Sequence, residues 1–307
     1  MSKKYFLNVQ SLSEPLRLDV FLSSSELFSS RSQVQNLIKK SQIYVNGEIH
    51  KSSFLVNNDD EITIVLGDEN SVVIEPENIL IDIKYEDDDV IVVNKPKNML
   101  THPTEKEIKG TLVNALLYRY GYDGLSTLNG FFRPGIVHRL DRNTTGLLIV
   151  TKNNVAHEFI SNQIKNKTAI RKYHALVFGN FENEQGVIDL PIGRNPKKPE
   201  KMSVVEDGKP SITEYRVVEQ FKGFSYLELN LKTGRTHQIR AHMSHIGHPI
   251  VNDSLYTKLP FKVKTIEQVL QSYSLKFTTL KNNDIIELEI PPDVDLEKTL
   301  RFLRSNK

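Results

Sequence analysis

The chain has 307 residues, of which 38% are hydrophobic and 25% charged, with a formal net charge of +2 and no cysteine. This composition is typical of a folded chain long enough for two domains, and it excludes disulfides, thiol nucleophiles and cysteine-ligated zinc. No apolar run approaches the ~20 residues of a membrane span, and the N-terminus lacks the apolar stretch of a signal peptide. We therefore expect a soluble, cytoplasmic protein with no membrane partner.

The first part of the chain carries the pattern of a small domain built from two helices and a hairpin. Apolar residues recur with helical spacing over 18–22 and again over 34–38. Residues 43–49 (IYVNGEI) predict a β-hairpin, because Asn-Gly suits the positive φ angles of a type I′ turn. Residues 61–66 predict a further strand, and the polar segment that follows predicts a linker.

This order of elements, with the sequence SRSQVQNLIKKSQIYVNGE, resembles an S4 RNA-binding domain. The resemblance implies that the second helix and the hairpin face RNA, with Arg31, Lys39 and Lys40 projecting from that surface. A solvated basic helix face is the alternative, since residues 1–76 hold seven Lys or Arg against ten Asp or Glu. We assign residues 12–76 to this domain, including a linker over 67–76, and residues 77–307 to a second domain.

The second domain shows many short strand patterns and few helical ones. The predicted strands lie at 90–94, 135–140, 147–151, 173–178, 211–218 and 226–231, and the predicted helices at 111–120, 157–165 and 238–245. This pattern favours an α+β fold over a repeating βαβ fold. Glycine-rich phosphate-binding loops are absent from the sequence, so no nucleotide cofactor is expected.

The segment GIVHRLDRNTTGLLIVTKN, residues 135–153, places a charged cluster between two apolar runs. If the first run is a strand, Arg139 and Asp141 share one face and His138 lies on the other. Asp141 would then lie at the end of a buried strand, where catalytic groups tend to be placed. The alternative from the residues alone is that Asp141 caps the turn and pairs with Arg139.

The segment LKTGRTHQIRAHMSHIGHPIVND, residues 231–253, holds Arg235, Arg240 and four histidines. A zinc site is one interpretation of the histidines over 237–248, because imidazole is a common zinc ligand. The spacing is not H-E-x-x-H, and no glutamate accompanies the histidines as a base. Structural hydrogen bonding is therefore the favoured role of these histidines.

Together with NKPKNMLTHPT (94–104) and RKYHALV (171–177), these segments resemble the RluA family of RNA pseudouridine synthases over nearly all of 80–257. Within that family the chain looks most like the RluD type, which acts on bacterial large-subunit ribosomal RNA. The resemblance implies a mixed, mostly antiparallel sheet with flanking helices over 77–307, preceded by the S4 domain. An S4 domain before the catalytic domain is a frequent arrangement in the family.

The resemblance also implies the chemistry. The family cuts uracil from C1′ of a uridine, turns the base and rejoins it through C5, and the family's aspartate falls on Asp141. A base inside folded RNA must be flipped out to be reached. Tyr173 matches the family's tyrosine, which stacks on the uracil and assists the late loss of the C5 proton. The family's basic partner falls on Arg235, which would keep Asp141 ionised.

Arg139 matches an arginine that in some relatives enters the RNA where the base left. The residues expected to contact RNA or substrate are His138, Arg139 and Arg142, together with Arg31, Lys39 and Lys40. We expect a monomer that modifies 23S ribosomal RNA and needs neither metal nor cofactor. The alternatives are a metal-dependent hydrolase built on the histidines of 237–248, and a noncatalytic RNA-binding ribosome assembly factor.

Overall fold

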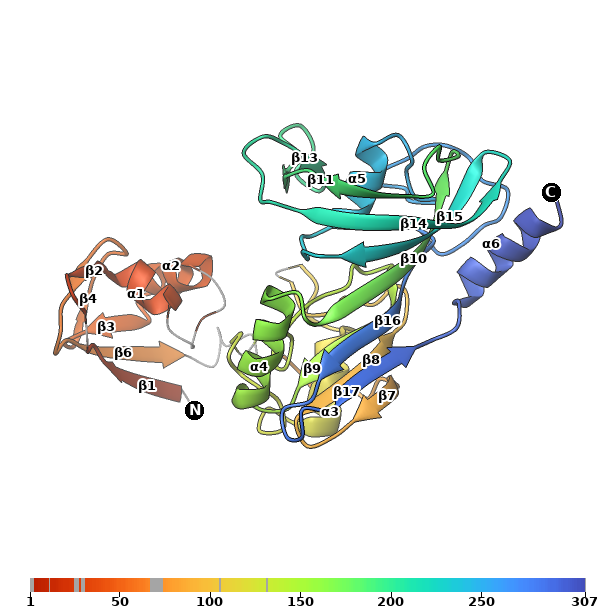
Figure 1. Ribbon diagram of the computed structural model, residues 1–307. Coiled ribbons are helices and arrows are strands. Elements are labelled where there is room, and N and C mark those ends of the chain that lie inside the picture. The colour runs from red at the N-terminus through yellow and green to blue at the C-terminus, as the bar shows by residue number, and fades with distance from the viewer. Residues whose placement is uncertain are drawn as a thin grey trace.

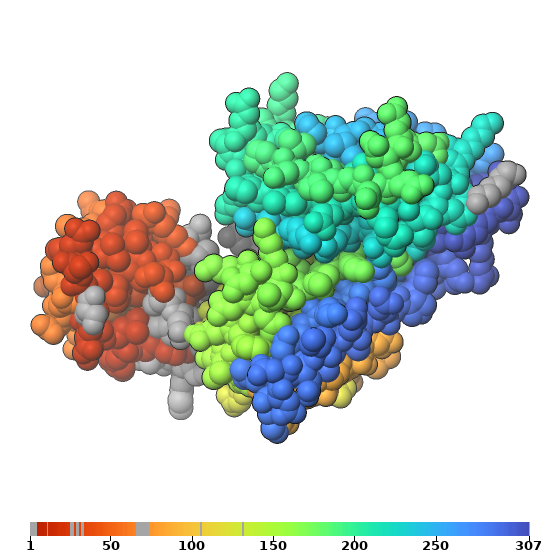
Figure 2. All heavy atoms as spheres, viewed as in Figure 1, coloured from red at the N-terminus to blue at the C-terminus, as the bar shows by residue number. Residues whose placement is uncertain are grey.

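The computed structural model describes residues 3–10, 12–24, 28, 31–66, 74–104, 106–130 and 132–306. The first domain is a four-stranded sheet in the order β1-β6-β3-β4, with a two-stranded ribbon of β2 and β5. Figure 2 shows this domain, coloured red to orange, as a lobe beside the larger second domain. Its elements are β1 (Lys3–Asn8), β2 (Leu16–Arg17), α1 (Leu18–Ser24), α2 (Arg31–Lys39), β3 (Ile43–Val45), β4 (Glu48–Ile49), β5 (Leu55–Val56) and β6 (Glu61–Leu66).

The predicted helices and hairpin of the first domain are confirmed. Asn46 and Gly47 connect β3 and β4 with φ angles of 52° and 84°, as a type I′ turn requires. The apolar faces of α1 and α2 pack with the sheet into a core of their own, which contains Leu18, Val34 and Ile62. Two helices and a hairpin therefore fold around a separate small core.

The two domains divide slightly differently from the predicted boundaries. β1 pairs antiparallel with β6 from Lys3 onward, so the sheet of the first domain includes residues before 12. Ile74 is buried in the main core of the second domain, so that core begins before residue 77. Residues 67–73 of the predicted linker lie outside the described residues.

The second domain is built on a nine-stranded sheet in the order β11-β14-β15-β10-β16-β9-β8-β7, with β17 also paired to β16 (Figure 1). All pairs are antiparallel except β16 with β9, so the predicted mixed, mostly antiparallel sheet is confirmed. The strands are β7 (Asp82–Glu86), β8 (Val90–Lys95), β9 (Thr145–Thr151), β10 (Ile170–Phe178), β11 (Gln185–Asp189), β14 (Ile212–Phe221), β15 (Phe224–Leu231), β16 (Leu270–Thr278) and β17 (Ile285–Glu289). A short hairpin of β12 (Ile192–Arg194) and β13 (Met202–Val204) stands beside the sheet.

Helices cover both faces of this sheet. α3 (Leu112–Tyr120) and α5 (Gln238–His245) contribute to the main core on one face, whereas α4 (Asn154–Lys165) and α6 (Val294–Arg304) pack on the other. Every residue of β9 is buried because this strand lies between the two layers. No helix in the described ranges is both long and apolar enough to cross a membrane.

Gly146 lets β9 approach β16 in the middle of the sheet. It pairs with Ser272, and a Cβ at this position would lie 2.0 Å from the Ser272 carbonyl oxygen. Its φ angle of 113° also disfavours other residues. A glycine is therefore required where the one parallel strand pair forms, a few residues after Asp141.

The predicted strand over 135–140 is wrong. Ile136 makes one isolated bridge to Val150, and the backbone then leaves the sheet. The Nε2 atom of His138 accepts a hydrogen bond from the backbone N–H of Ile149 at 3.0 Å. An imidazole nitrogen therefore replaces a backbone carbonyl as the acceptor for this N–H of β9. The backbone hydrogen-bond ladder between the two segments does not continue.

Candidate active site

Asp141 lies in the loop immediately before β9, and the backbone on both sides of it is held in place. Thr101 Oγ1 donates to the Leu140 carbonyl at 2.9 Å and accepts from the Leu140 N–H at 3.2 Å. The Thr144 N–H donates to the Asp141 carbonyl at 3.1 Å. The Asp141 side chain is 15% exposed, so its carboxylate is nearly buried yet reachable. A carboxylate on such a rigid base is suited to chemistry.

Lys95 also holds this loop in place, and the sequence patterns did not predict this role. Its side chain is fully buried at the end of β8. Nζ donates to the carbonyls of Pro96, Met99 and Arg142 at 2.7, 2.9 and 3.0 Å. Burial lowers the pKa of Lys95 to about 7, although the charge of Asp141 works in the opposite direction. The signal in the sequence was a lysine at the end of a strand that begins with four apolar residues.

The basic partner of Asp141 is Arg240, from α5. Arg240 Nη1 donates to Asp141 Oδ2 at 3.0 Å. The other edge of the guanidinium meets Asp253 in a two-bond fork, Nε to Oδ2 at 2.7 Å and Nη2 to Oδ1 at 2.8 Å. Burial alone would lower the pKa of Arg240, but hydrogen bonds and charge from Asp253 and Asp141 raise it. A permanently charged group therefore faces Asp141 in a fixed orientation.

The predicted pairing of Asp141 with Arg235 is wrong. Arg235 is exposed, and its Nε donates to the Pro210 carbonyl at 3.3 Å. It precedes α5, whereas Arg240 lies inside the helix and is buried. The segment TGRTHQIR contains two arginines. The one inside the helix is buried, and the one before the helix is exposed. The sequence signal for Arg240 and Asp253 was their place in the same motif.

A polar chain continues from Asp141 to the β12–β13 hairpin. His237 Nε2 lies 3.9 Å from Asp141 Oδ2, and its Nδ1 is 3.1 Å from the Tyr256 hydroxyl. That hydroxyl accepts from the Met202 N–H and donates to the Met202 carbonyl, both at 3.0 Å. The Tyr256 ring also lies under the Arg240 guanidinium, 5.0 Å from its carbon. One tyrosine thus links the hairpin to both neighbours of Asp141.

A cavity of about 610 Å³ opens beside this hairpin. Its lining includes Arg194, Lys209, Gly234 and Arg235. Cationic side chains on such a wall suit a polyanionic ligand. Arg235 therefore belongs to this cavity wall.

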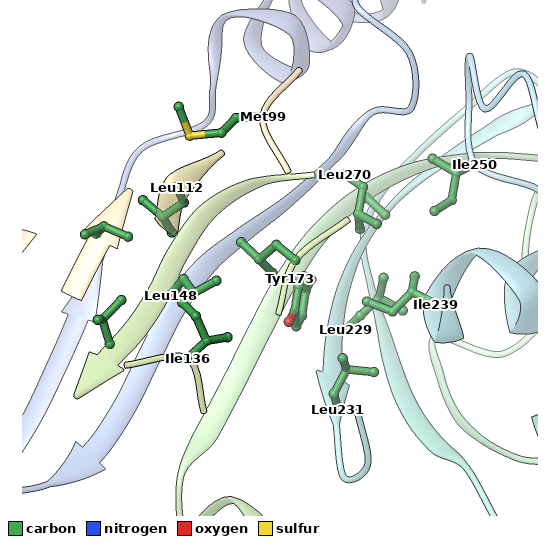
Figure 3. Close-up of a cluster of buried hydrophobic side chains, with 14 of the residues drawn as sticks. Met99, Leu112, Ile136, Leu148, Tyr173, Leu229, Leu231, Ile239, Ile250 and Leu270 are labelled. Atoms are coloured by element: carbon green, nitrogen blue, oxygen red, sulfur yellow. The ribbon is translucent and has the colours of Figure 1, made fainter. Parts of the chain in front are cut away.

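Tyr173 lies on β10 and is 4% exposed. Figure 3 shows it among the apolar side chains of the main core, with Ile136 and Leu148 on one side and Leu229 on the other. Burial raises the pKa of its phenol, while the charge of Arg171 and the Ser272 hydroxyl act in the opposite direction. The charge of Asp141 acts in the same direction as burial and is the smallest of these effects on the pKa of Tyr173.

The three residues predicted to contact substrate around Asp141 differ in their exposure and in their contacts. Arg139 is exposed and makes no ion pair with Asp141 among the described residues, so the alternative Arg139–Asp141 pair is not present. Arg142 is held by Glu107 through two bonds of 2.9 and 2.5 Å. His138 turns inward to β9, and burial lowers its pKa to about 3. Neutral and bonded to backbone, His138 is structural, which corrects its predicted substrate contact.

Arg31 in the first domain also has a structural partner. Asp19, fully buried, accepts from Arg31 Nε at 2.9 Å, from Arg17 Nε at 3.0 Å and from Gln35 Nε2 at 2.8 Å. Lys39 and Lys40, at the end of α2, are exposed. The predicted RNA-facing set thus divides into one arginine that ties α2 to α1 and two exposed lysines.

The histidines of 237–248 do not converge. His242 bonds to Thr213 and to the Leu190 carbonyl, both at 2.9 Å, and His248 bonds to the Phe178 carbonyl at 2.9 Å. Within the described ranges, no three His, Cys, Asp or Glu side chains are placed to hold a metal ion. These contacts give no support to the metal-dependent hydrolase considered from the sequence.

Comparison with known proteins agrees with this arrangement. The family model for RNA pseudouridylate synthase matches residues 89–245, and the model for the S4 domain matches residues 16–62. The "Uncharacterized RNA pseudouridine synthase YlyB" of Bacillus subtilis is 42% identical over 94% of this chain and 95% of its own length.

Two further relatives extend this comparison. The "Ribosomal large subunit pseudouridine synthase D" of Pasteurella multocida is 38% identical over 94% of this chain and 92% of its own. A solved structure, human RNA pseudouridylate synthase domain containing 1, superposes with a TM-score of 0.56 at 26% identity, covering 77% of this chain and 97% of its own. The predicted resemblance is confirmed, and the chain belongs to the RNA pseudouridylate synthase family as an RNA pseudouridine synthase with an S4 domain.

Proposed function

We propose that this enzyme converts uridines of large-subunit, 23S ribosomal RNA to pseudouridine, with Asp141 as the nucleophile. The observation that carries the proposal is a nearly buried carboxylate held in a fixed orientation by Arg240. The ribosomal substrate is supported by relatives named large-subunit synthases, which are 38% identical to this chain. Ribosomal RNA as substrate also accords with the expected cytoplasmic location.

The proposed reaction rearranges bonds within one nucleotide. The C1′–N1 bond breaks, C1′ bonds to C5, and the proton on C5 is lost while N1 gains one. Asp141 attacks the nucleotide, at C1′ or at C6, and Arg240 stabilises the carboxylate that is released again. A carboxylate at an anomeric carbon has a precedent in retaining glycosidases. We propose that Tyr173 supports the base and helps to remove the C5 proton.

The target base must leave the RNA stack before Asp141 can reach it. Arg139 is exposed beside Asp141 and has no salt-bridge partner in the part of the chain that the structure describes, so it is available to the RNA. We propose that Arg139 occupies the position from which the base is flipped. Arg142, Lys39 and Lys40 are proposed phosphate contacts, and the enzyme is proposed to act as a monomer.

The experiment that tests this function maps pseudouridine in ribosomal RNA from cells with and without the gene. The expected result is that one or a few 23S sites lose the modification and regain it when the wild-type gene returns. The Asp141→Asn variant should not restore it, because an amide is a far weaker nucleophile. The purified variant should still bind ribosomal RNA in a filter-binding assay.

An Asp141→Asn variant with near-normal turnover would remove Asp141 as the nucleophile. Unchanged modification of all 23S sites in the deletion strain would instead remove the ribosomal substrate. Loss of pseudouridine from another RNA would identify that RNA as the substrate of the same reaction. The two parts of the proposal, residue and substrate, are thus tested separately.

A further inference from the structure

Arg171 is a buried cation that the chemistry above does not use. It lies on β10, and only 4% of the residue is exposed. No hydrogen bond or ion pair involves its guanidinium in the part of the chain that the structure describes, and its Nε is sealed from solvent without an acceptor. Arg240, the other buried arginine among the described residues, is bonded to two carboxylates.

Burying Arg171 with an unbonded Nε lowers the stability of the free protein, because that N–H loses hydration without gaining an acceptor and the cation gains no counterion. The surroundings of Arg171 do not compensate. Its positive charge acts on the neutral ring of His138 and on the phenol of Tyr173, neither of which supplies a negative charge. A ligand that carries the missing negative charge would explain why an arginine is buried at this position.

We propose that Arg171 binds a phosphate group of the RNA backbone next to the flipped uridine, an inference that rests on the proposed function. RNA supplies anions as phosphodiesters, and a guanidinium binds phosphate with paired N–H donors. Asp141 already has Arg240 as its counterion, so Arg171 is left for the substrate.

The position of Arg171 on β10 fits a contact within one nucleotide. Arg171 and Tyr173 are buried on the same face of the strand, since side chains two residues apart point the same way. Their Cα atoms are about 6.6 Å apart at the usual rise of a strand. A bound nucleotide could then contact Tyr173 with its base and Arg171 with its phosphate, because the ribose spans a similar distance.

Gly234 leaves room for the guanidinium. A Cβ at Gly234 would lie 3.0 Å from Arg171 Nη1, so the arginine occupies space that a side chain at 234 would take. Gly234 is also part of the wall of the cavity that Arg194, Lys209 and Arg235 line. Arg171 thus lies next to a surface that already carries positive charge, where an RNA strand would pass.

The test compares Arg171→Met with Arg301→Met in the full chain. Arg301, an exposed arginine on α6 that pairs with Glu297, is the matched control because its loss changes the net charge equally. The substrate is ribosomal RNA from cells lacking the gene. For Arg171→Met we expect a KM at least tenfold higher, a smaller change in kcat than in KM, and a slope of log affinity against log salt reduced by about 0.7.

Thermal unfolding separates this role from a structural one. Because the proposed site lacks its anion in the free protein, Arg171→Met should raise the Tm without RNA, whereas a structural arginine would lower it. Arg171→Lys, which keeps the charge, should retain the wild-type salt slope. A variant Arg171→Met that fails to fold, or that has a lower Tm and an unchanged slope, would overturn the proposal.

Failure of the proposed function gives a different result. If the wild-type enzyme forms no pseudouridine in this RNA, the proposed substrate is wrong. The salt slopes of RNA binding for Arg171→Met and Arg301→Met then still decide the phosphate site. Equal slopes for the two variants would overturn it, and a smaller slope for Arg171→Met alone would support it.

Discussion

The choice between two arginines five positions apart determines how Asp141 is held. Arg240 is buried and bonded to Asp141 and Asp253, whereas Arg235 is exposed at a cavity wall. A buried guanidinium in a two-bond fork keeps one orientation, and an exposed one does not. The residue that aims the carboxylate is therefore the one with the second carboxylate behind it.

Arg240→Met should lower kcat by about 100-fold or more, since an electrostatic contact to the reacting group is lost. Arg235→Met should change kcat by less than about threefold and act on KM instead. Steady-state kinetics on ribosomal RNA at one temperature would measure both variants. Because Arg240→Met leaves Asp253 buried and unpaired, it should also destabilise the fold by about 3–5 kcal/mol.

Near-UV circular dichroism would show whether Arg240→Met is still folded at the assay temperature. Arg235→Met is the control for the general effect of removing an arginine from this segment. Equal losses of kcat in the two variants would contradict the role assigned to Arg240. A loss of kcat in Arg235→Met alone would instead support Arg235 as the basic partner of Asp141.

At the scale of elements, α2 has two different basic ends. Arg31 at its start bonds to the buried Asp19 of α1, and so ties the two helices together. Lys39 at its end is exposed and makes no ion pair within the described ranges. The same helix therefore carries one stabilising arginine and one cation that is available to RNA.

Arg31→Gln should reduce the free energy of unfolding of the first domain by about 1 kcal/mol, the scale of a hydrogen bond to a charged group with one partner exposed. Lys39→Gln should leave the stability unchanged and reduce the salt slope of RNA binding by about 0.7–0.9. Urea unfolding and filter binding of both full-length variants would measure the difference. A Lys39→Gln variant with the wild-type slope would remove Lys39 from the RNA surface.

At the scale of the whole molecule, several buried or half-buried histidines are held in neutral form. Burial lowers the pKa of His138 to about 3 and those of His102, His157 and His174 to about 4. In the unfolded chain each would take up a proton near pH 6.5. As the pH falls below 6.5 the unfolded state binds protons that the folded state does not, so stability is lost.

These histidines should thus make the free energy of unfolding decline between pH 6.5 and 5. Each histidine contributes at most about 1.4 kcal/mol per pH unit to this decline. Urea unfolding at several pH values would measure it. His138→Asn, which keeps an acceptor for the Ile149 N–H, should show a shallower decline than the wild type. The same decline in the variant would contradict the assignment.

Most elements and the chemical class could be predicted from the amino-acid sequence alone. The Asn-Gly turn, the apolar run of β9 and the helical spacing of α5 are local patterns, and local patterns predict local structure. The ordered motifs around Asp141 and Tyr173 indicated the family, which the comparisons confirmed. The strand expected over 135–140 failed because a side chain, His138, took the edge of β9.

Only the tertiary structure decided which charged groups meet. Asp141, Arg240 and Asp253 come from three separate segments, and their contact depends on how α5 packs against the sheet. Spacing along the chain does not distinguish a buried arginine from an exposed one in the same motif. Nor does it show that Arg171 is buried without a counterion, because the absence of a partner is a property of the surrounding packing.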